Sequence, residues 1–215
     1  MAITELVFPP LKADKHIRAE FYKNVPSSVR ATFNVAGGPR ASAVARVLES
    51  VPINAENHCG YLAVFSWESL DTVKNFLTTP DFAKFKASLT EYVDGPPMLQ
   101  FFETPPGVAP EQTLQDSTHF FVIKAMGTEA QVSQAKRRWD EITATFSKIV
   151  GDEVKYHTGD GKQDYDGQFA GFSGWKSFAA LNKALGQADI QNQLRALAEV
   201  GGSISTFTLE LKHVF

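Results

Sequence analysis

Two residues near the starts of similar segments could carry acid–base chemistry. Segments 4–8 (TELVF) and 118–122 (THFFV) match at a shift of 114 residues, which places Glu5 and His119 at corresponding positions. A carboxylate and an imidazole that face one shared space could take up and return a proton. Two exposed charges at strand ends are the simpler interpretation, because charged side chains are seldom buried without partners. Both interpretations stay open, with Glu5 and His119 as catalytic candidates.

A second group of candidates lies at the start of the apolar segment 61–67. His58 and Tyr61 flank Cys59, and a tyrosine–histidine couple could bind or deprotonate a phenol. Cys59 is a weaker candidate as the nucleophile, because adjacent residues of a strand point to opposite faces. A polar cluster at the beginning of a strand is the alternative interpretation.

Two tyrosines of the second half are candidate ligand contacts. Tyr156 is in step with Val154 on a predicted strand, so we expect Tyr156 rather than His157 to face an apolar cavity. Tyr165 lies in the Gly- and Asp-rich segment 159–167. Such a loop could cover a ligand, although a solvated turn is the simpler account.

The sequence patterns favour neither a metal site nor a bound cofactor. The histidines are scattered, and no His-Glu-x-x-His or paired Cys-x-x-Cys is present. The stretch 160–167 resembles a calcium loop, but Lys162 and Ser173 stand where the first and last carboxylates are needed. Segment 171–175 narrowly misses the nucleophile motif Gly-x-Ser-x-Gly. We therefore predict chemistry without a metal or cofactor.

Composition restricts the class of partner. The 215 residues carry a net charge of −3 and the pI is near 6.0, which argues against a basic surface for nucleic acid or an anionic membrane. One cysteine rules out an internal disulfide and suggests a reducing compartment. There is no long apolar run and no signal-like start, so we expect a soluble cytoplasmic protein. The 17 phenylalanines predict an aromatic interior.

The elements that must position these residues repeat along the chain. Segment 61–82 matches 169–190 at a constant shift of 108 residues, which is typical of a duplicated domain. The predicted units are a first repeat at 1–104, a Pro-rich extended linker at 105–116 and a second repeat at 117–215.

Each repeat has the pattern βαββαβ with an additional helix before the last strand. Pro26 leaves the end of the first helix open between residues 23 and 37. The remaining predicted elements are strands at 3–8, 41–48, 60–67 and 98–104 with helices at 69–78 and 80–91, then strands at 118–125, 154–158, 168–175 and 203–214 with helices at 128–149, 178–185 and 188–200.

Both faces of the strand at 61–67 are largely apolar. Helices can cover one face only, so the other must meet a second sheet. Two four-stranded sheets from the two repeats can close into an eight-stranded α+β barrel, which is wide enough to hold one small ligand. We therefore expect an enclosed apolar cavity in the barrel.

At this point the sequence resembles the dimeric α+β barrel superfamily in fused tandem form, in particular its antibiotic-biosynthesis-monooxygenase-like and stress-responsive branches. The residues that carry the resemblance are YLAVFSWESL (61–70), Phe76 and the turn 79–82, with the second-half echo FSGWKSF (172–178). The resemblance spans both halves, but the shared motif, a strand that ends in Trp-x-Ser before a helix, is short.

The resemblance implies a hydrophobic, often aromatic, small-molecule ligand. It implies that Trp67 and Trp175, at equivalent strand ends, line the ligand cavity; two core aromatics are the alternative. Phe65 and Phe121 are further candidates for contacting a ligand. Many catalytic members carry a histidine nine residues after the tryptophan, whereas Phe76 and Ala184 stand at those positions here, which speaks against a haem ligand or histidine base on this helix.

The resulting expectation is a cofactor-independent enzyme, a monooxygenase or a cyclase, that acts on an aromatic or polyketide-like molecule. The alternative is a small-molecule-binding or stress-responsive protein without a reaction. A titratable group inside the cavity would favour catalysis, and a purely apolar lining would favour binding. The resemblance also makes a homodimer an expected assembly.

Overall fold

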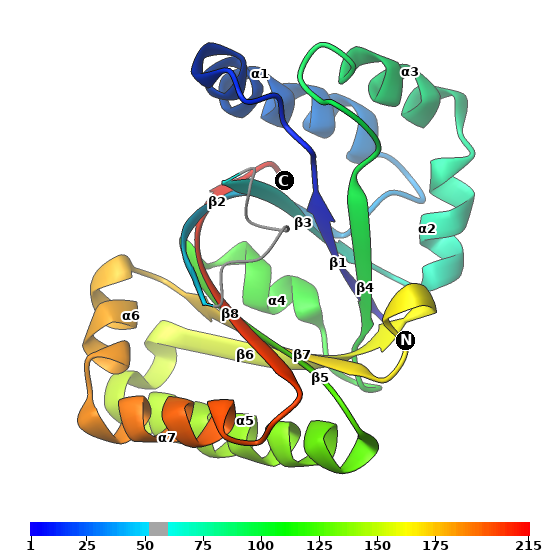
Figure 1. Ribbon diagram of the computed structural model, residues 1–215. Helices are drawn as coiled ribbons and strands as arrows, with labels where there is room; N and C mark the ends of the chain where they lie inside the picture. The colour runs from blue at the N-terminus through cyan, green and yellow to red at the C-terminus, as the bar shows by residue number, and fades with distance from the viewer. Residues whose placement is uncertain (52–59) are drawn as a thin grey trace.

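The computed structural model describes residues 1–51 and 60–215, and its elements follow an order that repeats once (Figure 1). The first half consists of β1 (Ile3–Phe8), α1 (Lys15–Phe33), β2 (Ala41–Val51), β3 (Tyr61–Trp67), α2 (Leu70–Leu77), α3 (Pro80–Ser88) and β4 (Met98–Glu103). The second half consists of β5 (His119–Met126), α5 (Glu129–Val150), β6 (Val154–Lys162), β7 (Gln168–Trp175), α6 (Phe178–Leu185), α7 (Ala188–Ala198) and β8 (Ser203–His213). Helix α4 (Pro110–Gln115) lies between the halves in the chain. The predicted βαββαβ order with its additional helix is confirmed.

The eight strands form one closed antiparallel barrel in the order β1-β3-β2-β8-β5-β7-β6-β4. The first half contributes the run β4-β1-β3-β2, and the second half contributes the equivalent run β8-β5-β7-β6. The halves are joined by the pairs β2–β8 and β4–β6. Closure pairs the edge strands that each half alone would expose, and the predicted α+β class with an eight-stranded barrel is confirmed.

The long helices lie outside the barrel in two groups. Helices α1, α2 and α3 cover the first-half strands, while α5, α6 and α7 cover the second-half strands on the opposite side (Figure 1). In the part of the chain that the structure describes, no helix is both long and apolar enough to cross a membrane.

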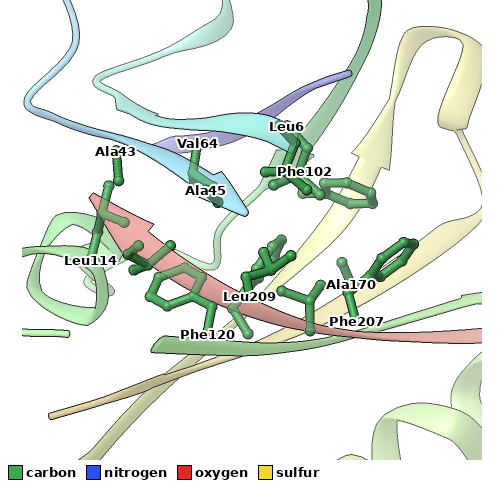
Figure 2. Packing of buried hydrophobic residues seen from close by; sticks show 14 of the residues in the cluster. Leu6, Ala43, Ala45, Val64, Phe102, Leu114, Phe120, Ala170, Phe207 and Leu209 are labelled. Atoms are coloured by element: carbon green, nitrogen blue, oxygen red, sulfur yellow. The ribbon is translucent and has the colours of Figure 1, made fainter. Parts of the chain in front are cut away.

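The inside of the barrel is filled by the protein's own side chains. Figure 2 shows many of them pointing toward one another from several strands. The buried members of this cluster are Leu6, Phe8, Ala41, Ala43, Ala45, Leu62, Val64, Phe102, Leu114, Phe120, Val122, Ala170, Phe172, Phe207, Leu209 and Leu211. Two hollows that the described residues line are both shallow and lie on the outer surface. The expectation of a ligand cavity inside the barrel was therefore wrong.

The predicted linker 105–116 is not extended throughout, because it contains α4. Pro110 occupies the first turn of this helix, where its missing N–H would have no partner anyway. Leu114 of α4 packs into the barrel cluster (Figure 2), so α4 covers one end of the barrel.

Helix α1 has a defined end where the sequence left one open, and strand β6 runs further than the sequence predicts. Helix α1 continues through Pro26 to Phe33, although proline removes a hydrogen bond to the carbonyl four residues earlier. That carbonyl, on Tyr22, accepts from Lys212 Nζ at 3.4 Å instead. Strand β6 extends to Lys162, through much of the predicted loop, and pairs there with Phe101 of β4.

Candidate functional site

Glu5 is a carboxyl group buried between a sheet and its helices. Residues of β1 alternate in direction: Leu6 and Phe8 point into the barrel, while Ile3 packs beneath the first-half helices. Glu5 is in step with Ile3, so its side chain lies on the helix-facing side, where it is 3% exposed. A carboxyl group this deeply buried is uncommon and marks a candidate site.

Trp67 supplies the hydrogen bond that holds this carboxyl group. The indole Nε1 donates to Glu5 Oε2 at 2.7 Å, and Trp67 is fully buried. Burial raises the pKa of Glu5 to about 7, and the Trp67 hydrogen bond opposes that rise. Glu5 can therefore hold or release a proton near neutral pH, as a general acid or base must.

Aromatic rings surround the Glu5–Trp67 pair. Phe65 and Phe101 are the direct cross-strand neighbours of Glu5 on β3 and β4. Phe33 of α1 stacks on Phe65, with ring centroids 5.0 Å apart and planes 14° from parallel. The ring of Phe33 also contacts the rings of Trp67, Phe76, Phe82 and Phe85. We call this set, with Glu5, the aromatic layer.

Ser42 of β2 belongs to the same face of the sheet. It lies directly opposite Phe65, which in turn lies opposite Glu5, and directly opposed residues share a face. Ser42 is fully buried, and its hydroxyl has no hydrogen-bond partner. Sequence analysis did not find Ser42, because a single serine in an apolar strand carries no signal of this kind.

The helix that covers the aromatic layer is more loosely packed than its counterpart in the second half. Helix α3 buries none of its residues, whereas α7 buries Ile190 and Leu197. Phe82 of α3 corresponds to Ile190 at the shift of 108, yet Phe82 is only partly buried. A ligand could therefore displace the covering helix at a lower free-energy cost in the first half than in the second.

The predicted pairing of Glu5 with His119 was wrong. Trp67 pairs with Ile3, and the equivalent Trp175 pairs with His119. The register thus equates Ile3 with His119 at a shift of 116, and Glu5 with Phe121. His119 stacks on Phe178 of α6 at 4.9 Å on the second-half side of the barrel, so it cannot exchange a proton with Glu5.

The equivalent layer of the second half has no buried acid. Trp175 Nε1 donates to Ser173 Oγ at 3.0 Å, and Ser173 Oγ donates to the Phe121 carbonyl at 3.0 Å. Trp139 of α5 lies directly over Gly171, where a Cβ atom would come within 2.4 Å of the ring. Trp175 and Phe121 are therefore core residues around a satisfied serine.

The remaining sequence candidates do not join the aromatic layer. Tyr61 shares a face with Phe65 but lies at the other end of β3, against the ring of Tyr22 at 5.2 Å. Tyr165 is half-buried in the short turn that follows β6. His58, with its neighbour Cys59, lies outside the described residues.

The choice between Tyr156 and His157 was also wrong. Tyr156 is in step with Val154, but it is 47% exposed. His157 points into the barrel, where its Nε2 lies 2.9 Å from Thr4 Oγ1 and its ring stacks on Phe172. Burial lowers the pKa of His157 to about 3, so this imidazole is neutral at physiological pH.

The residues present do not fit a haem or a metal ion in these layers. Phe76 and Ala184, at the positions where a histidine would face the layer, are buried and apolar. In residues 1–51 and 60–215, no three His, Cys, Asp or Glu side chains gather closely enough to hold a metal ion.

Comparison with solved structures finds this fold in other proteins. A candidate monooxygenase from Fusobacterium nucleatum superposes with a TM-score of 0.62 at 9% identity, over 99% of this chain and 93% of that one. A candidate monooxygenase from Lactobacillus acidophilus gives 0.62 at 8% identity, over 100% and 94%. An anthrone oxidase-like protein gives 0.61 at 12% identity, over 99% and 91%. No protein-family model and no curated protein matches the sequence. The similarity to the three structures shows that the chain has the fold of a tandem ferredoxin-like α+β barrel.

Proposed function

We propose that this protein is a cofactor-independent enzyme of the monooxygenase type, acting on a hydrophobic aromatic molecule in the aromatic layer around Glu5. The observation that supports the proposal is one carboxyl group, buried among aromatic rings, whose pKa lies near 7. The names of the structural neighbours agree with this class of reaction.

The chemistry begins with a proton transfer to Glu5. An aromatic substrate with an activated methylene or phenol gives its proton to the carboxylate, and the anion that results can donate electrons directly to O2. For a methylene, one atom of O2 becomes the oxygen of a ketone, and the other leaves as water with the two hydrogens that the methylene carbon has lost. The surrounding rings exclude water from the anion, and Trp67 orients the carboxylate.

Oxygen uptake with anthrone, an activated aromatic methylene, tests this proposal. Chelator-treated protein should consume O2 faster than the background oxidation, and the product should be the ketone by mass spectrometry. Because the base must be ionised, the rate should rise about tenfold from pH 6 to pH 8. E5Q should abolish the protein-dependent rate, while the exposed-site control E91Q should keep it. Equal rates for E5Q and the natural protein would refute the role of Glu5.

Binding without reaction is the second candidate. The aromatic lining favours it, because rings alone give an apolar ligand most of its affinity. A protein that binds anthrone but adds nothing to its background oxidation at any pH would support this second function.

A further inference from the structure

The unpartnered hydroxyl of Ser42 needs a physical explanation. Ser42 is fully buried and its Oγ makes no hydrogen bond, and leaving a buried hydroxyl unsatisfied is costly. Its backbone is fully engaged, since the amide donates to the Phe215 carbonyl and the Ser42 carbonyl accepts from Val214. The hydroxyl itself is therefore the one group of this residue that a ligand could satisfy.

Ser42 and Glu5 flank one aromatic ring. The register places Ser42 on one side of Phe65 and Glu5 on the other. Only Oε2 of Glu5 accepts from a described residue, Trp67, so Oε1 also has capacity to spare. Two groups that can hydrogen-bond thus face each other across an aromatic floor.

The spacing of the strands sets the size of what could lie between them. Strands in a sheet lie about 4.8 Å apart, so the backbones of Glu5 and Ser42 are about 10 Å apart across two strand spacings. Two hydrogen bonds of about 2.8 Å then leave about 4–5 Å between the two ligand oxygens. This is the separation of two oxygens in meta positions on one six-membered ring, whereas oxygens in para positions lie further apart.

The position over Phe65 is now taken by the ring of Phe33. Phe33 stacks on Phe65, and it is the last residue of α1, followed by the exposed residues Asn34 and Val35. Phe33 is covered from outside by Phe82 and Phe85 of α3, the helix that buries none of its residues. A ligand ring can therefore replace the Phe33 ring by loosening one helix end.

We propose that Ser42 determines the specificity of this site: together with Glu5 it binds an aromatic ring that carries two oxygen atoms in meta positions, stacked on Phe65 in place of Phe33. This inference rests on the proposed function for the location of the site and adds the class of ligand. Glu5 binds the phenol oxygen, and the Ser42 hydroxyl donates to the second oxygen.

The second half provides an internal comparison. Its equivalent row is Tyr156, Ser173 and Phe121. There the serine hydroxyl both accepts from Trp175 and donates to a carbonyl, so it has no need of a ligand. An unsatisfied serine is therefore not a requirement of this fold at this row.

Two phenols of nearly the same size test the proposal by calorimetric titration of the full chain. In 3-methoxyphenol the second oxygen is present, and in 3-ethylphenol a methylene replaces it. The natural protein should bind 3-methoxyphenol about fivefold more tightly, which corresponds to one neutral hydrogen bond. In S42A this ratio should fall to about one, while the affinity for 3-ethylphenol stays the same. S173A, which removes the buried serine in the equivalent row of the second half, should keep the fivefold ratio.

Two further variants separate the possible failures. F33L should bind both phenols more tightly, because it leaves room over Phe65; unchanged affinity for a folded F33L would overturn the position of the ligand. E5Q should weaken the binding of 3-ethylphenol, as the proposed function requires. If E5Q does so but 3-methoxyphenol binds no more tightly than 3-ethylphenol, or S42A keeps the fivefold ratio, the role of Ser42 is refuted while the role of Glu5 stands. If neither phenol binds, both proposals fail.

Discussion

Replacing Glu5 by glutamine should change how the stability of the protein depends on pH. Glutamine has nearly the same shape, and its carbonyl oxygen can still accept from Trp67 Nε1. The variant therefore removes the ionisation while it keeps the packing and the hydrogen bond. Any difference in pH dependence between E5Q and the natural protein reports on the Glu5 carboxyl group alone.

The magnitude follows from the change in pKa on folding. Glu5 has a pKa of about 7 in the folded protein against an ordinary value of 4.5. Since the folded pKa is raised, the contribution to stability is complete below pH 4.5 and is lost as the pH rises through 7. A difference of about 2.5 in pKa corresponds to about 3 kcal/mol, at about 1.4 kcal/mol for each tenfold change in proton affinity. Glu5 is fully buried, so solvent screening does not reduce this figure.

Urea denaturation followed by tryptophan fluorescence, at pH values from 4 to 8.5, measures the difference. The difference in unfolding free energy, E5Q minus the natural protein, should be about 3 kcal/mol larger at pH 8 than at pH 4. The exposed-site variant E91Q should run parallel to the natural protein. Curves for E5Q and the natural protein that stay parallel across this range would refute a buried, protonatable Glu5, and with it the basis of the proposed site.

Three further outcomes follow from other parts of the structure. Burial lowers the pKa of His157 to about 3, so its contribution to stability is present above pH 6.5 and is lost as the pH falls. Between pH 6.5 and pH 5 the natural protein should therefore lose about 2 kcal/mol of unfolding free energy that H157Q keeps, as measured by urea denaturation. The same loss in both proteins would contradict the burial of His157. G171A should destabilise the protein by about 1–3 kcal/mol, because the new methyl group meets the ring of Trp139; a wild-type melting temperature would show that α5 can shift without cost. Amide hydrogen exchange should be faster in α3 than in α7, since α3 buries no residue; equal protection of the two helices would contradict a displaceable cover.

Much of the fold could be predicted from the sequence because its strongest signals are local or repeated. The match of 61–82 with 169–190 aligned Trp67 with Trp175 correctly, since that long apolar strand and helix recur without a gap. The first strands were misaligned by two residues, because a five-residue apolar match fits equally well at several shifts. That error made Glu5 correspond to His119 instead of Phe121.

The direction of individual side chains was harder to predict. Strands with apolar residues on both faces give no alternation that tells the barrel side from the helix side, so the sequence could not show that Glu5, Phe65 and Trp67 face the helices. On the helix-facing side of β6, Val154 is buried but Tyr156 is exposed. Which positions the helices cover depends on tertiary packing, which the sequence of the strand does not show. Whether the Ser42 hydroxyl finds a hydrogen-bond partner depends in the same way on contacts between distant elements.

Comparison of the two halves supports the proposed function of Glu5. Both halves bury a tryptophan at the same strand end, and both satisfy its indole N–H. The second half does so with Ser173, a neutral hydroxyl that also finds its own acceptor. The first half instead uses a carboxyl group whose burial costs about 3 kcal/mol once it is ionised. Because the same chain satisfies the equivalent tryptophan with a neutral hydroxyl, packing alone does not explain the acid, which supports the proposed role of Glu5 as a group that exchanges protons near neutral pH.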